Sequence, residues 1–370
     1  MLTNSNYITQ EKIKVSQSSN GDDIFINKIT IKGSHNNAPS VYMQASMHAS
    51  ELQGNTVMIQ LVEYFRLHQP KGDVYLIPQC NPIGMDSFQG AGHQGRFDSA
   101  TGDNWNRYYY NPEIDYKSFV SEHINSTTSE YKKSFENLIQ SKISNELKNE
   151  LYLSRARKIN LIVQHEAQKA DFVLDLHTDT DAITYVYTAS YAKKSAETFG
   201  YKHSLVIPND CGGALDEAIF VPWWRLQEEF AKQGRDEKIL KEGFTLELGS
   251  EEDICFDDSV AQTQGVLSYL KSKGIIDSVF ATNRLHSEVV HHDISNYKQI
   301  RAIEGGMYEW LVKAGESFKA GDVIGQYIQT CTMSKKDLTL PVGGTIISIH
   351  TTGAVCQGTQ LLNLALDVSN

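Results

Sequence analysis

Four segments of the chain have the hydrophobic pattern of β-strands. Residues 41–45 and 74–78 are short and mostly apolar, and residues 170–176 are apolar at nearly every position, as expected of a strand buried on both faces. Residues 243–249 instead alternate between apolar and polar side chains and end in glycine. These segments predict strands of one largely buried sheet.

Segments with helical spacing lie between the predicted strands. Glu51 opens a stretch in which Val57, Leu61 and Phe65 recur at the spacing of one helix face. Residues 116–168 are polar and helical in pattern, and we interpret them as an insertion able to cover or reshape the mouth of a binding site. Strands that alternate with helices predict an α/β fold with a mixed central β-sheet flanked by helices.

Glycines recur at a fixed spacing near the end of the chain. Gly306–Gly315 and Gly344–Gly353 both span nine positions, and short β-branched runs accompany them. This repeat predicts a small two-fold all-β barrel or sandwich. We therefore predict two domains, formed by residues 1–284 and residues 285–370.

Composition and charge narrow the class of protein. With 370 residues, 40% of them hydrophobic and 21% charged, the chain can bury at least one large core. Its net charge of −11, without a long basic run, argues against nucleic acid and anionic membranes as partners. No run of about 18 apolar residues occurs, and the first residues lack the profile of a signal peptide. Since the five cysteines are also widely scattered, we expect a cytoplasmic protein with reduced thiols.

His48, Glu51 and His177 form the candidate metal site. His48 and Glu51 are three residues apart just after the strand at 41–45, so a tight turn can direct both side chains to one point. His177 follows the strand at 170–176, and the carboxyl ends of strands form the working edge of open α/β sheets. Two imidazoles and a carboxylate are the ligands of a catalytic zinc ion, which keeps a fourth position open for water. A lone His-x-x-Glu often binds no metal, whereas the joint pattern predicts one zinc ion per chain.

Glu247 is the candidate general acid/base. It points to the opposite face of its strand from Phe244, Leu246 and Leu248, so its carboxylate is not placed for packing. The alternative is a solvated glutamate on an exposed edge strand. Beside a zinc ion, such a carboxylate takes a proton from the attacking water and returns it to the leaving amine.

A glycine-rich loop carries two candidate arginines, Arg96 and Arg107. The loop begins at Asn81, and four glycines before Arg96 indicate an irregular backbone close to a ligand. An arginine fork pairs a carboxylate through two parallel hydrogen bonds. Beside a metal, two arginines therefore suggest one for a substrate carboxylate and one for a developing oxyanion. Taken singly, each arginine is equally compatible with a solvated surface position.

Together these segments resemble the succinylglutamate desuccinylase/aspartoacylase family of the zinc carboxypeptidase superfamily. The matching pieces occur in the family's order over roughly residues 30–275. They are His48-x-x-Glu51, Asn81-Pro82, Arg96, Asn106-Arg107, Asp175-Leu176-His177 and Thr245-Leu246-Glu247-Leu248-Gly249. One departure is Ala49, where the family usually has glycine. We expect the turn to survive with a negative φ at this small residue.

The resemblance implies a role for each candidate residue. The implied zinc ligands are His48, Glu51 and His177. Glu247 would be the catalytic acid/base, and Arg96 would polarise the scissile carbonyl. Asn106 and Arg107 would hold the α-carboxylate of the substrate.

The implied function is zinc-dependent hydrolysis of an amide bond in a small carboxylate-bearing substrate, above all an N-acyl amino acid. A metallocarboxypeptidase that acts on short peptides is the alternative among enzymes. A non-catalytic protein that uses the zinc cleft for binding is disfavoured because such a protein has no need of Glu247. The expected partner is thus a small molecule, and homo-oligomerisation is left open.

The predicted C-terminal domain resembles the biotinyl/lipoyl-type barrel that some members of the same family carry. Lys335 lies between the two glycine repeats, where a carrier domain presents its modified lysine. The Met-Lys-Met tripeptide of such domains is absent, however. We therefore expect the barrel to pack on the catalytic domain and to shape its pocket or an oligomer contact.

Overall fold

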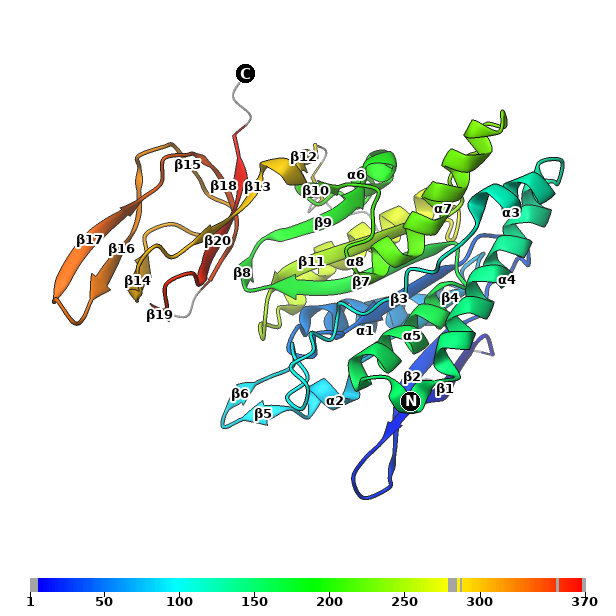
Figure 1. Cartoon of the computed structure of the whole chain (residues 1–370), viewed down its shortest axis with the longest axis horizontal. Helices are drawn as coiled ribbons and strands as arrows, with labels where there is room; N and C mark the ends of the chain where they lie inside the picture. Colours follow the sequence, from blue (N-terminus) through cyan, green and yellow to red (C-terminus); the bar gives the residue numbers. More distant parts are fainter. Residues whose placement is uncertain (1–5, 279–284, 287, 351–352, 368–370) are drawn as a thin grey trace.

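A mixed nine-stranded sheet forms the centre of the computed structural model, which describes residues 6–278, 285, 286, 288–350 and 353–367 (Figure 1). In spatial order its strands are β1 (Ile8–Gln17), β2 (Asp23–Ile31), β4 (Val74–Ile77), β3 (Val41–Ala45), β7 (Phe172–Asp179), β11 (Glu242–Ser250), β9 (Thr184–Ala189), β10 (His203–Ile207) and β12 (Val290–Asp293). The inner strands β4, β3, β7 and β11 are parallel, whereas β1, β2 and β9 each have an antiparallel neighbour. The predicted fold class is confirmed.

Helices cover both faces of this sheet, so its inner strands are buried on both sides (Figure 1). One face packs against α1 (Gln53–Leu67), α6 (Lys193–Glu197) and α8 (Phe256–Ser272). The other packs against α5 (Arg155–Ala167) and α7 (Leu215–Lys232), with α3 (Tyr116–His123) and α4 (Thr128–Leu147) outside them. Short elements occupy the connections: α2 (Pro82–Met85), β5 (Phe88–Gln89), β6 (Gly92–His93), η1 (Glu150–Tyr152) and η2 (Ser190–Ala192).

The strand predictions match the observed strands closely because burial on both faces leaves a clear hydrophobic signal. In β11 the alternation is also realised, since Phe244, Leu246 and Leu248 join the core with α1 and α8. The first helix begins two residues later than predicted. Glu51 lies in the turn before it, which frees the carboxylate from the helix surface.

The C-terminal residues form two smaller sheets. One contains β13 (Tyr297–Arg301), β20 (Gln360–Leu366), β18 (Gly344–Ile349) and β15 (Ser317–Phe318). The other contains β17 (Ser334–Thr339), β16 (Val323–Gln329), β14 (Gly306–Trp310) and β19 (Ala354–Val355). Lys335 lies within β17, opposite Ile328, and not at a hairpin tip.

Strands β8 and β12 link these sheets to the rest of the described chain. β8 (Asp181–Ala182), which follows β7, pairs with β18. β12 precedes β13 and is connected to it by η3 (Ile294–Asn296), yet β12 pairs with β10 of the large sheet. The predicted boundary at residue 284 falls among residues 279–284, outside the described residues, and the two-domain division stays a prediction. No helix in the described part combines the length and apolar composition needed to cross a membrane.

Candidate metal centre and active site

His48, Glu51 and His177 lie together at the carboxyl ends of β3 and β7. Their candidate ligand atoms all lie within 4.8 Å of one another, and all three side chains are buried. Nδ1 of His48 is 2.7 Å from Oε1 of Glu51, and Nδ1 of His177 is 2.7 Å from Oε2. The carboxylate thus lies between the two rings, and this cluster could hold one metal ion.

A sharp turn after β3 brings His48 and Glu51 to this point. Ser46 adopts a left-handed conformation with a φ of 58°, and its hydroxyl donates to Oδ1 of Asn55, 2.6 Å away. Ala49 keeps a negative φ, as expected, and its N–H donates to the carbonyl of Gly95 at 2.9 Å. A Cβ at position 95 would collide with this backbone, so glycine is required where the loop crosses the turn.

The outer nitrogen of each ring has its own partner. Nε2 of His48 is 2.9 Å from Oδ1 of Asn104, and Nε2 of His177 is 3.1 Å from Oδ2 of Asp175. Asp175 is held in turn by Gln44, whose Nε2 donates to Oδ1 at 2.9 Å. Such partners orient metal-binding histidines, and here they leave Nδ1 of each ring facing the Glu51 carboxylate, where a metal ion would bind.

Neither Asn104 nor Asp175 is among the site residues predicted from the sequence. The sequence does contain an indication for Asp175. Residues two apart on a strand share a face, and Asp175 precedes His177 by two positions on the same strand. For Asn104 the sequence contains no such indication except that the residue lies in the loop that carries Arg96 and Arg107.

Charges within the cluster favour the metal-binding state of the carboxylate. Burial opposes ionisation of Glu51, but the adjacent His48 and His177 outweigh it and lower its pKa well below the ordinary value. Burial likewise opposes protonation of His177, yet the carboxylates of Asp175 and Glu51 raise its pKa well above the ordinary value. A buried site that gathers opposite charges in this way suits a cation, which would replace the ring protons.

Glu247 extends into the same site from the neighbouring strand. It lies opposite His177 in the parallel pairing of β11 with β7. Its Oε2 is buried and has no hydrogen-bond partner in the described structure. Burial, followed by the charge of Glu51, raises the pKa of Glu247 well above its ordinary value. A carboxyl whose pKa is raised in this way suits an acid/base that accepts a proton and later donates it.

The three predicted substrate-contacting residues also reach this site. Nη1 of Arg96 donates to Oε1 of Glu51 at 2.9 Å. Arg107 is exposed, and its Nη1 donates to the backbone carbonyl of Asn106 at 2.7 Å. Nδ2 of Asn106 lies 3.2 Å from Nε2 of His177, and its Oδ1 is buried with no hydrogen-bond partner among the described residues. The side chain of Asn106 therefore faces the metal cluster, while its backbone carbonyl accepts from the guanidinium of Arg107; the roles of all three residues remain predictions.

These residues line one cavity of about 630 Å³, which we call the metal cavity. Part of its wall comes from the C-terminal residues: Tyr297, Gln299, His350, Gln360 and Asn363. Asn363 contacts the large sheet directly, since its Nδ2 donates to Oδ2 of Asp179 at 3.3 Å. None of residues 116–168, which the structure describes completely, lines the metal cavity.

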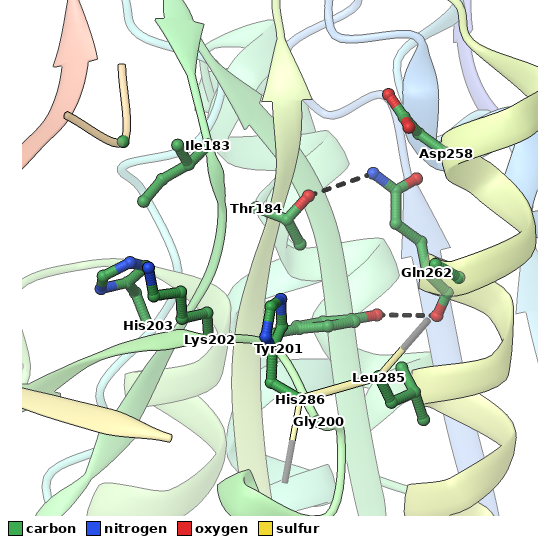
Figure 2. Close-up of a pocket in the computed structure, with 12 residues that line it drawn as sticks. Ile183, Thr184, Gly200, Tyr201, Lys202, His203, Asp258, Gln262, Leu285 and His286 are labelled. Atoms are coloured by element: carbon green, nitrogen blue, oxygen red, sulfur yellow. Dashed lines mark hydrogen bonds between the residues drawn. The ribbon is translucent and has the colours of Figure 1, made fainter. Parts of the chain in front are cut away.

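A smaller cavity of about 320 Å³ lies where β9, β10 and α8 meet (Figure 2). Gln262 Nε2 donates to Oγ1 of Thr184 at 3.2 Å, and the Tyr201 hydroxyl donates to the backbone carbonyl of Gln262 at 2.7 Å. Because these polar groups satisfy one another, and the only metal-ligand cluster among the described residues is His48, Glu51 and His177, we place the chemistry in the metal cavity.

Comparison with known proteins identifies the family. Residues 37–272, which include every predicted site residue, match the model of the succinylglutamate desuccinylase/aspartoacylase catalytic domain. The chain belongs to the succinylglutamate desuccinylase/aspartoacylase family. Desuccinylases and aspartoacylases are hydrolases, so family membership supports an enzyme. No curated protein matches the sequence.

Solved structures extend the likeness beyond residues 37–272 to nearly the full length of the chain. A structure from Shewanella frigidimarina named for succinylglutamate desuccinylase/aspartoacylase is 32% identical, with a TM-score of 0.93 and 98% of each chain covered. A family protein from Shewanella amazonensis is 31% identical, with a TM-score of 0.91, covering 96% of this chain and 98% of its own. The product-bound ectoine utilization protein EutE (DoeB) from Ruegeria pomeroyi is 14% identical, with a TM-score of 0.67, covering 98% and 96%. It shares the fold.

Proposed function

We propose that this protein is a zinc-dependent amidohydrolase that releases the amino acid from a small N-acyl amino acid. The observation that carries the proposal is the position of Glu247 beside the cluster of His48, Glu51 and His177, with its buried Oε2 lacking a hydrogen-bond partner in the part of the chain that the structure describes. Two imidazole nitrogens and one carboxylate oxygen are a donor set that zinc accepts, and they leave a coordination position open. Relatives named for desuccinylase and aspartoacylase support an N-acyl substrate.

Zinc, when bound, would lower the pKa of a coordinated water and polarise the amide carbonyl. Oε2 of Glu247 accepts a proton from the attacking water and later donates it to the leaving amine nitrogen. The raised pKa of Glu247 suits both steps, because the carboxyl can hold the proton between them. Asp175 and Asn104 hold the rings of His177 and His48 in orientation throughout.

Each of the two arginines binds a different negatively charged group of the substrate. Arg96, which reaches Glu51 at the metal cluster, stabilises the negative charge that develops on the carbonyl oxygen. Arg107 pairs with the α-carboxylate at the exposed side of the metal cavity, together with Asn106. Binding of the α-carboxylate at Arg107 positions the scissile bond next to Glu247.

The proposal is tested by assaying metal-free and zinc-loaded protein on N-acetyl and N-succinyl amino acids and on short peptides. We expect one zinc per chain, release of free amino acid from N-acyl substrates with zinc, and loss of activity after chelation. Faster cleavage of peptides would favour the carboxypeptidase alternative. Zinc binding with no hydrolysis of either class would favour the binding-protein alternative.

A further inference from the structure

We propose that Asn160 of α5 is a positioning residue, which holds Asn106 and Arg107 where they bind the α-carboxylate of the substrate. The inference rests on the proposed function and adds a residue that acts through Arg107. It also gives a role to α5, the last helix of residues 116–168. None of these residues, all of which the structure describes, lines the metal cavity, so α5 acts on the loop from behind.

The side-chain amide of Asn160 binds the backbone on both sides of Asn106 and Arg107. Its Nδ2 donates to the carbonyl of Trp105 at 2.7 Å, and its Oδ1 accepts the N–H of Tyr108 at 3.0 Å. The two residues enclosed between these hydrogen bonds are the two proposed to bind the carboxylate. Loss of the amide would therefore release the backbone directly before and directly after them.

Asn160 is fully buried in an otherwise apolar stripe of α5. Ala156 and Val163, four residues before it and three residues after it, belong to the core between α5 and the sheet. A buried amide costs free energy unless its hydrogen bonds are made. Its other contact is weak, since Nδ2 is 3.5 Å from Sδ of Met47, a poor acceptor. The loop backbone thus accounts for an amide at this buried position.

The loop needs such partners because residues 105–115 form no helix or strand. Gln164, one turn after Asn160, donates to the carbonyl of Tyr110 and accepts its N–H, each at 2.7 Å. Four residues of a helix rise about 6 Å, close to the about 6.6 Å of two residues of extended chain. Successive amides of α5 therefore match Tyr108 and Tyr110, as a neighbouring strand would.

A second contact of α5 supports the same loop closer to Arg96. Arg155, the first residue of α5, binds the carboxylate of Asp98, with Nε donating to Oδ2 at 3.0 Å and Nη2 donating to Oδ1. Asp98 is buried and lies two residues after Arg96. The N–H of Trp105 also donates to the carbonyl of Arg96 at 3.2 Å. The contacts at Asp98 and Asn160 thus hold two connected parts of one loop.

The test uses the N-acyl amino acid that the zinc-loaded protein cleaves best and its C-terminally amidated analogue. In Asn160→Leu, which keeps a branched side chain but makes no hydrogen bond, KM for the acid should rise by about tenfold, because a slightly misplaced binding group is costly. We expect little change in kcat, in zinc content or in turnover of the amidated analogue, which does not use Arg107. A merely structural role would instead lower turnover of both substrates together.

Two further variants complete this comparison. Gln164→Met removes the neighbouring amide and should act in the same direction, which keeps the test available should Asn160→Leu fold poorly. Gln140→Ala is the matched control, because Nε2 of Gln140 donates to the backbone carbonyl of His165 at 3.0 Å and does not contact the loop. Both substrates should be cleaved normally by this control.

A double variant tests whether Asn160 acts through Arg107. In a protein that already carries Arg107→Ala, adding Asn160→Leu should raise KM by less than about threefold, because the positioned group is already gone. A further rise of about tenfold would mean that the two residues act independently, and it would overturn the inference.

Amide hydrogen exchange separates this inference from the proposed function. Exchange in residues 105–110 should be faster in Asn160→Leu than in the unchanged protein or in Gln140→Ala, since the N–H of Tyr108 loses its acceptor. If Asn160→Leu affects acid and amide equally, the inference is overturned while the proposed function stands. If the unchanged protein hydrolyses no N-acyl compound, the proposed function fails. Faster exchange confined to residues 105–110 would then support the positioning role by itself, and unchanged exchange would overturn it.

Discussion

Glu247 lies opposite His177 across the parallel strands β11 and β7. The same pairing puts Thr245 opposite Asp175, so two successive polar rows cross the two strands. A shift of one residue in this register would turn Glu247 into the apolar core. Strand register, fixed by the burial of Phe244, Leu246 and Leu248, thus sets the distance between the candidate acid/base and the candidate ligand.

Replacing Glu247 by glutamine tests the acid/base assignment. Glu247→Gln keeps the size and polarity of the side chain but cannot carry the proton, so kcat should fall by about 10³-fold, within the range for lost general acid/base catalysis. The zinc content, measured by atomic absorption, should stay at that of the unchanged protein. Near-normal turnover in a variant that retains zinc would remove Glu247 from the mechanism.

Replacing Asp175 tests the support of the metal cluster. Asp175→Asn removes the charge that orients His177, so zinc affinity should fall by about 10- to 100-fold. Competition with a chelating dye measures this affinity directly. Asp181→Asn, an exposed acid on β8, is the control. Equal affinities in the two variants would mean that Asp175 plays no part in holding the ligand.

Replacing Arg107 tests the carboxylate anchor. Arg107→Ala should raise KM for N-acyl amino acids by about 10- to 100-fold, since it removes charge-assisted hydrogen bonds. The C-terminally amidated analogues lack the carboxylate and should lose little. Comparable losses on both series would show that Arg107 does not act on the carboxylate.

Acid should destabilise the contact between β10 and β12 through His203. Burial and the neighbouring His292 lower the pKa of His203 to about 4, against an ordinary value of 6.5. As the pH falls from 6.5 toward 4, the unfolded chain binds a proton that the folded chain does not, so the free energy of unfolding decreases.

This acid effect is measured as the thermal midpoint of unfolding between pH 7 and pH 5. Over this pH range the midpoint temperature of the unchanged protein should fall further than that of His203→Gln. Glutamine retains a polar side chain but does not titrate. Metal release at low pH acts on both proteins and cancels in the comparison. Parallel pH dependences would exclude His203 as the source.

The sequence by itself determined the fold class, the inner strands and the family, because each of these follows from hydrophobic patterns and motifs within short segments. Continuous apolar runs reveal strands buried on both faces, and His48, Glu51, His177 and Glu247 stand at fixed places relative to those strands. The proposed zinc ligands could therefore be named before their geometry was known.

Only the tertiary structure decided which distant side chains complete the metal cavity. Asn104 beside His48, Asp216 beneath β11, and Tyr297 and Asn363 from the C-terminal strands carry no local pattern that links them to the site. The physical reason is that hydrophobic burial is non-directional: an apolar pattern tells which face of an element is covered, but not which part of the chain covers it.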